Sequence, residues 1–178
     1  MNDVNETFLD PMSFEESVKD ESSDDIQPPT VLTFTLGEQV LAVNVHRVQE
    51  ILDLATISPL PNAPHEVLGM IDLRGQGIAI VDLASRIGAT AASNRDARII
   101  VFELPNGSSS TSLGVVADRV LRVREMVEKE IEPVPETLCN WRCDVAEGIL
   151  RTDDGIAMIL DIDRILCNSA QPGPFDFG

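Results

Sequence analysis

The sequence predicts an all-β fold with short helices, built from two similar units that pack against each other. From residue 31 onward it consists of short apolar stretches, rich in β-branched residues and separated by glycine, proline and asparagine turns. The same order of landmarks then occurs twice along the chain. With 178 residues, 43% of them apolar, the chain is long enough for one domain or for two small ones that share a core.

The first unit, residues 31–87, is predicted to contain four strands and two short helices. The expected strands are residues 31–36, 40–45, 67–73 and 78–81. Asn44 is a suitable N-cap for a helix over residues 45–52, because apolar residues at 45, 48, 51 and 52 have helical spacing. A second helix is expected over 82–87. Three prolines between 59 and 64 exclude regular structure there.

The second unit, residues 97–165, repeats the landmarks of the first in order. Aspartates near the end of each unit, Asp82 and Asp161, correspond with a shift of one residue. The matched runs are Phe34-Thr35-Leu36 with Phe102-Glu103-Leu104, Leu41-Ala42-Val43 with Gly114-Val115-Val116, Arg47-Val48 with Arg119-Val120, and Gly77-Ile78-Ala79 with Gly155-Ile156-Ala157. Each unit is too short to close a core alone, so two small barrels packed together are expected. The alternative is a chance likeness between short β-rich segments.

Charge is concentrated at the N-terminus. The chain has 13 basic and 30 acidic residues, a net charge of −17, which argues against binding to nucleic acid. Residues 1–29 carry nine acids against Lys19 alone and are predicted to be a flexible acidic arm, with Phe8 and Phe14 as anchors if the arm instead docks. Residues 168–178 are predicted to be a flexible tail.

The sequence favours a cytoplasmic protein without membrane insertion. No apolar run reaches the roughly 18 residues that span a bilayer, and the N-terminus lacks the basic and apolar regions of an export signal. Three cysteines, an odd number, do not form a disulfide framework.

Sequence motifs of the common catalytic and nucleotide-binding sites are missing. The chain has no glycine-rich phosphate loop, no Gly-x-Ser-x-Gly elbow and only two histidines, His46 and His65. Cys139, Cys143 and Cys167 leave a metal or redox role open as an alternative, although a metal site needs more ligands at recognisable spacing. We therefore expect no enzyme activity, no catalytic residue, no cofactor and no metal, and a binding role gains weight.

Five runs in register resemble the CheW family of bacterial chemotaxis coupling proteins. They are Phe34-Thr35-Leu36-Gly37-Glu38, Val48-Gln49-Glu50-Ile51, Pro61-Asn62-Ala63-Pro64, Leu73-Arg74-Gly75 and Ile80-Val81-Asp82-Leu83. The resemblance covers residues 30–167. It implies two intertwined five-stranded SH3-like barrels, barrel 1 over about 30–88 plus a C-terminal segment and barrel 2 over about 97–150.

The resemblance also implies what the protein binds. Family members are non-enzymatic adaptors that bind the cytoplasmic tip of methyl-accepting chemoreceptors and the regulatory domain of the histidine kinase CheA. They are cytoplasmic and recruited to receptor arrays at the inner face of the membrane. The receptor groove lies between the barrels, and the kinase docks mainly through the end of the first barrel.

Six residues correspond to partner-binding positions of the family: Val48, Glu50, Arg74, Gly75, Gly114 and Val123. More ordinary roles are a core position for Val48, a solvated face for Glu50, and for Arg74 an ion pair with Asp72 or Asp82. Two departures concern the same hairpin. Asp72 replaces the usual asparagine, and Gln76-Gly77 replace the start of an apolar strand, with Gly77 at a bulky groove position.

Three other functions compete with a stand-alone adaptor. The chain could be the CheW-like part of a larger protein, such as a CheV adaptor or CheA itself. It could serve a non-flagellar chemosensory array with twitching or second-messenger output. A small cysteine-dependent enzyme using Cys139, Cys143 and a histidine is the alternative from another class.

Overall fold

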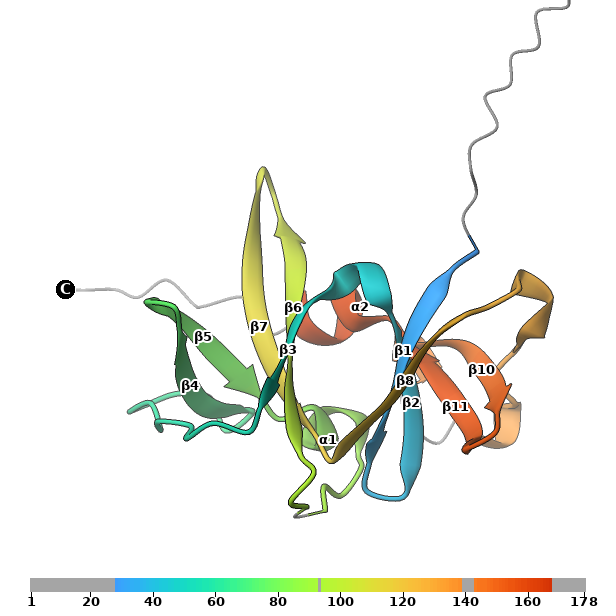
Figure 1. Cartoon of the computed structure of the whole chain (residues 1–178), viewed down its shortest axis with the longest axis horizontal. Helices are drawn as coiled ribbons and strands as arrows, with labels where there is room; N and C mark the ends of the chain where they lie inside the picture. Colours follow the sequence, from blue (N-terminus) through green and yellow to red (C-terminus); the bar gives the residue numbers. More distant parts are fainter. Residues whose placement is uncertain (1–27, 93, 139–142, 168–178) are drawn as a thin grey trace, which may run out of the picture.

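The computed structural model describes residues 28–92, 94–138 and 143–167. Within these ranges the chain is mostly β-strand with two short α-helices, α1 (Leu83–Ile87) and α2 (Ile162–Cys167), which confirms the predicted fold class (Figure 1). No helix in these ranges has the length and apolar character needed to cross a membrane. The predicted arm, apart from Pro28 and Pro29, and the predicted tail lie outside the described residues.

The strands form two sheets. Sheet A has the order β8-β1-β2-β11-β10-β9, and sheet B has the order β3-β6-β7-β5-β4. The strands of sheet A are β1 (Thr30–Leu36), β2 (Gln39–Asn44), β8 (Arg119–Glu125), β9 (Ile131–Glu132), β10 (Ala146–Thr152) and β11 (Gly155–Leu160). The strands of sheet B are β3 (Val48–Asp53), β4 (Val67–Leu73), β5 (Gln76–Val81), β6 (Arg98–Asn106) and β7 (Ser109–Ala117). Short 3₁₀ turns are η2 (Val45–Arg47), η3 (Glu128–Glu130), η4 (Glu136–Leu138) and η5 (Cys143–Val145).

The predicted strands of the first unit are present, but the helix predicted over residues 45–52 is wrong. Asn44 does cap a helical turn, since its side chain accepts a hydrogen bond from the His46 amide at 2.9 Å, but that turn ends at Arg47 and β3 follows. The register of β3 against β6 shifts between Val48 and Glu50. This irregularity places Val48 and Ile51 on one face of a strand, at the three-residue spacing that resembled a helix.

The two sequence units exchange strands, which contradicts the predicted division into barrels. Sheet A combines β1 and β2 of the first unit with β8 to β11 of the second. Sheet B combines β3, β4 and β5 of the first unit with β6 and β7 of the second. Two short connections join a strand of one sheet to a strand of the other. Three residues (Val45–Arg47) separate β2 from β3, and only Asp118 separates β7 from β8. The chain therefore crosses to the other sheet at both points (Figure 1).

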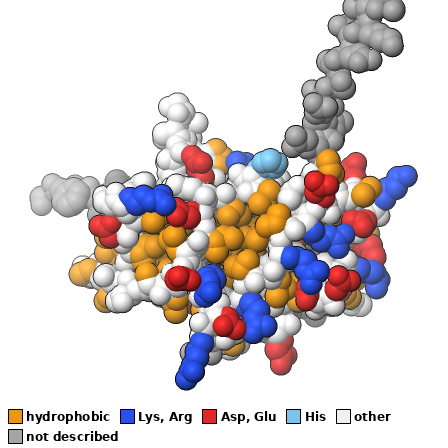
Figure 2. Space-filling model, viewed as in Figure 1, with side chains coloured by type: hydrophobic (Ala, Val, Ile, Leu, Met, Phe, Trp, Pro, Cys, Tyr) orange, Lys and Arg blue, Asp and Glu red, His pale blue; other side chains and the backbone are white. Residues whose placement is uncertain are grey.

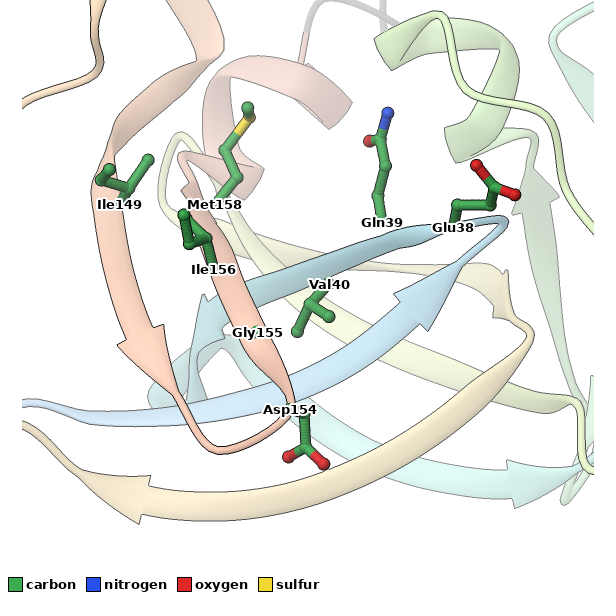
Figure 3. Close-up of a pocket in the computed structure, with 8 residues that line it drawn as sticks. All are labelled: Glu38, Gln39, Val40, Ile149, Asp154, Gly155, Ile156 and Met158. Carbon is green, nitrogen blue, oxygen red and sulfur yellow. The ribbon is translucent and has the colours of Figure 1, made fainter.

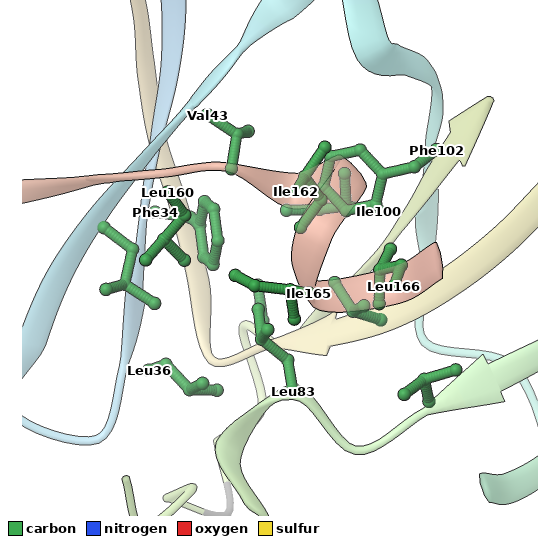
Figure 4. Packing of buried hydrophobic residues seen from close by; sticks show 14 of the residues in the cluster. Phe34, Leu36, Val43, Leu83, Ile100, Phe102, Leu160, Ile162, Ile165 and Leu166 are labelled. Atoms are coloured by element: carbon green, nitrogen blue, oxygen red, sulfur yellow. The ribbon is translucent and has the colours of Figure 1, made fainter. Parts of the chain in front are cut away.

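The central core lies between the sheets and explains why the strands in it do not alternate cleanly. In β1, Leu32 and Phe34 face a central cluster, whereas Val31 faces a separate cluster inside sheet A. Strand β6 behaves likewise, with Phe102 in the central cluster and Val101 in a cluster inside sheet B. The β1–β2 hairpin and the β6–β7 hairpin are therefore each buried on both faces. Helix α2 adds Ile162, Ile165 and Leu166 to the central cluster (Figure 4).

The structure aligns the two units by matching Asp82 with Asp161, which differs by one residue from the match of Gly77 with Gly155 predicted from the sequence. Asp82 caps α1 by accepting from the Ser85 amide at 3.0 Å, and Asp161 accepts from the Arg164 amide at 3.1 Å at the start of α2. Counting back from these caps places Gly77 opposite Ile156 instead of Gly155. Burial agrees, because the next position inward is fully buried in both strands, Ile78 in β5 and Ala157 in β11.

Candidate partner-binding site

The β4–β5 hairpin presents Arg74 at a tight turn. Arg74 has φ 54° and the following Gly75 has φ 83°, so both central residues are left-handed, as the turn type that matches strand twist requires. The Asp72 carboxylate accepts a hydrogen bond from the Gly75 amide at 2.8 Å and holds the turn from inside. The guanidinium therefore projects from a defined turn, with 74% of the side chain exposed.

Arg74 and Glu50, both predicted as site residues, form an ion pair. An Arg74 terminal nitrogen lies 2.7 Å from Glu50 Oε1, and the Glu50 side chain is only 26% exposed. Their strands, β4 and β3, are at opposite edges of sheet B, so the pair spans the two edges of the curled sheet. The partners suggested from sequence, Asp72 and Asp82, bind backbone amides of their own turns instead.

Strand β3 supplies one apolar side of the surface between the sheets. Val48 is half-buried and packs against the central cluster. Ile51 pairs with Ile100, a residue of that cluster, and directly paired residues of antiparallel strands point to the same side. Ile51 is nevertheless 40% exposed because β3 is an edge strand.

Strand β8 supplies the other side in the same way. Val120 packs against the central cluster, and Val123 pairs with Leu32 of that cluster while staying 55% exposed. We call Val48, Ile51, Val120 and Val123 together the inter-sheet face. Figure 2 shows apolar side chains gathered in the middle of one side of the molecule, with charged side chains on either side of them.

The sequence predicted Val48 and Val123 of this face as partner-binding residues, but not Ile51 and Val120. The duplication was a usable signal, because matching Arg47-Val48 with Arg119-Val120 also matches Ile51 with Val123.

Gly114 does not fit its predicted role. It is buried in the middle of β7, where an added Cβ would lie 2.5 Å from Ile80 Cδ1 and 3.3 Å from Ile99 Cγ2. A partner cannot touch it at this position. The glycine instead leaves room for the cluster inside sheet B, of which Ile80 and Ile99 are members.

A second ion pair occupies the equivalent place in sheet A with its charges reversed. Arg122, which corresponds to Glu50, lies 3.2 Å from Asp153 and 3.0 Å from Asp154 at the tip of the β10–β11 hairpin. In both sheets an edge-strand side chain thus binds the tip of the hairpin that belongs to its sheet.

Of the three cysteines, Cys167 is the one whose side chain the structure describes. Burial, followed by the charge of Asp163, raises the pKa of the Cys167 thiol above its ordinary value, the opposite of what a nucleophile needs. No group of three or more potential ligands within the described ranges could hold a metal ion. Cys139 and the Cys143 side chain lie outside what is described.

Comparison with known proteins places these features in one family. The family model described as the CheW-like domain matches residues 30–169. The chain belongs to the CheW family. Its CheW relatives include the chemotaxis protein CheW of Thermotoga maritima, 30% identical over 136 residues that cover 76% of this chain and 86% of that protein. CheW of Rhizobium meliloti is 28% identical over 135 residues, covering 76% and 85%.

A solved structure of the family shares the fold. The crystal structure of the scaffolding protein TtCheW from Thermoanaerobacter tengcongensis superimposes with a TM-score of 0.68 at 28% identity. The match covers 78% of this chain and 88% of that one. The CheW fold expected from the resemblance is therefore confirmed.

Proposed function

We propose that this chain is a non-enzymatic chemotaxis adaptor that couples methyl-accepting receptors to a CheA-type histidine kinase. The observation that carries the proposal is the inter-sheet face, together with the Arg74–Glu50 pair whose glutamate precedes Ile51 on β3, in a chain of the CheW family. In this proposal the protein works in the cytoplasm and is recruited to receptor arrays at the inner face of the membrane.

The inter-sheet face suits a helical receptor tip. Ile51 and Val123 are exposed on the two edge strands. Val48 and Val120, on the same strands, are partly buried and pack against the central cluster. An amphipathic helix binds such a surface through apolar residues repeated every three or four positions. Burying one exposed aliphatic side chain contributes about 1.5–3 kcal/mol at most, so both sides of the face matter.

In this proposal Arg74 supplies the polar anchor of the receptor site. Only one of its terminal nitrogens is bonded to Glu50 among the described residues, and the rest of the guanidinium fork is open to a partner carboxylate or helix C-terminal carbonyl. Glu50 holds the fork in place, so in this proposal it acts by positioning Arg74. Gly75 permits the turn that presents it.

The kinase requires a surface that stays free when a receptor is bound. Exposed apolar side chains on β4 and on the connection between β3 and β4 offer one, namely Leu54 (51% exposed), Leu68 (42%) and Met70 (36%). These residues belong to sheet B or follow it directly, which agrees with kinase docking at one end of the molecule. In this proposal receptor and kinase bind together on different sides of sheet B.

Co-sedimentation with receptor-bearing membranes, with and without CheA from the same genome, tests the proposal. Val123→Asp is expected to reduce receptor binding about tenfold or more, since it places a charge in an apolar contact. Val127→Asp is the matched control, because Val127 is equally exposed at 57% but lies beyond the end of β8. Equal losses in both variants, or full binding by Val123→Asp, would contradict a receptor contact at this face.

A further inference from the structure

A hollow on sheet A is lined by residues other than those of the inter-sheet face and of the proposed kinase surface. It has a volume of about 410 Å³ and lies across β2, β11 and β10 (Figure 3). Its apolar lining includes Ile149, Ile156 and Met158, and Ile156 is 54% exposed. The volume is within the range of roughly 300–1,000 Å³ that ligand sites occupy.

Two acidic side chains flank this apolar lining. Glu38 is exposed in the β1–β2 turn and has no ion pair among the described residues, whereas Asp154 lies 3.0 Å from Arg122. Gln39 contributes an acceptor, because its Oε1 is buried without a hydrogen-bond donor in the described structure. Figure 3 shows the side chains of Gln39 and Met158 on the same side of neighbouring strands. Gln39 is itself one of the residues that line the hollow.

The equivalent place on sheet B is filled. There Gly77 replaces Ile156, and a Cβ on Gly77 would lie 2.6 Å from Met70 Sδ, which shows that Met70 covers that position. The counterpart of Glu38 in the β6–β7 hairpin is the neutral Ser110. The acidic side chain beside the hollow and its uncovered apolar lining are therefore found in sheet A and not at the equivalent place in sheet B.

We propose that this hollow binds an arginine side chain carried by a polypeptide partner. The aliphatic stem packs on Ile156 and Met158, as long cationic side chains do on apolar surfaces. The guanidinium faces Glu38 and donates to Gln39 Oε1, which satisfies both the unpaired charge and the unpaired acceptor. Residues next to the arginine lie along the exposed part of Ile156.

Methyl NMR on the full chain, with Ile149, Ile156 and Met158 as reporters, tests this inference with defined peptides. The probes are acetyl-Leu-Arg-Leu-amide, acetyl-arginine amide, and the tripeptide with neutral citrulline in place of arginine. The arginine tripeptide is expected to shift these methyl signals. It is expected to bind about fivefold more tightly than the citrulline peptide, because the charge contributes about 1 kcal/mol. It is expected to bind about fivefold more tightly than acetyl-arginine amide as well, because the flanking residues contribute a similar amount.

Charge variants separate a specific site from general attraction to an acidic protein. Glu38→Gln is expected to weaken the tripeptide about fivefold. Glu103→Gln removes the same charge from an exposed position on β6 and is expected to change binding less than about twofold.

Equal losses in both variants, or equal binding of the citrulline peptide, would overturn the inference. Equal binding of acetyl-arginine amide and the tripeptide would show that a small cation, not a polypeptide, is the ligand. Methyl shifts that grow with protein concentration in the absence of peptide would show that a second copy of the chain covers the hollow. Either result would also overturn the inference.

Discussion

The two sheets share one construction plan but present different surfaces. In each, an edge strand bonds to a hairpin tip, through Glu50 and Arg74 in sheet B and through Arg122 and Asp153 in sheet A. The core positions repeat closely, whereas the charges of the two ion pairs at the hairpin tips are reversed. In sheet B, Met70 covers the position that corresponds to the hollow on sheet A. Packing constrains the buried positions of both copies, so the two halves differ mainly at their surfaces.

The comparison is tested most severely in the shared core. Phe34 and Phe102 hold equivalent positions in the central cluster and are both fully buried. Replacing either by alanine is expected to lower the free energy of unfolding by about 3–5 kcal/mol. Because the cluster joins both sheets, each variant is expected to unfold in a single denaturant transition. Two separate transitions would show that the sheets fold independently.

The ion pairs test whether the halves differ in function. Arg74→Ala and Arg122→Ala each remove an ion pair whose arginine side chain is 74% and 47% exposed, respectively. Because solvent screens such pairs, each variant is expected to change the free energy of unfolding by less than about 1 kcal/mol. In receptor co-sedimentation, Arg74→Ala is expected to weaken binding about tenfold, the size of a lost charge-assisted hydrogen bond, with Arg122→Ala close to wild type. Unfolding of Arg74→Ala near room temperature would assign Arg74 a structural role instead.

The smallest expected effect is a pH dependence confined to sheet A. Partial burial, followed by the charges of Asp161 and Asp163, raises the pKa of Glu147, whose counterpart in sheet B is the uncharged Leu68. A carboxyl whose pKa is higher in the folded state favours folding when protonated, and this contribution is lost as pH rises through that pKa.

Glu147→Gln is therefore expected to stabilise the protein by a few tenths of a kcal/mol at pH 7, reduced by solvent screening, and by less at pH 4. Thermal unfolding at the two pH values measures it. A larger gain at pH 4 than at pH 7 would reverse the sign and contradict the interpretation.

Local patterns predicted the short elements well where one face of a strand or one cap decided them. The strands around Arg74-Gly75 and the cap at Asn44 were of this kind. The helix expected over 45–52 failed because an irregularity in β3 gave Val48 and Ile51 a helical spacing. Ile51 and Val120 were missed as site residues for a related reason, since exposure of an apolar residue on an edge strand depends on which strand ends the sheet.

The amino-acid sequence by itself determined the family, the all-β class and the duplication, and it named Arg74 and Glu50 as candidate site residues, because these depend on short runs of adjacent residues. The tertiary structure decided which copy completes which sheet, that Gly114 is interior, and that Glu50 meets Arg74 across the edges of sheet B. Those outcomes arise because short connections carry the chain across a common core. Contacts between strands far apart in the sequence then set the surface.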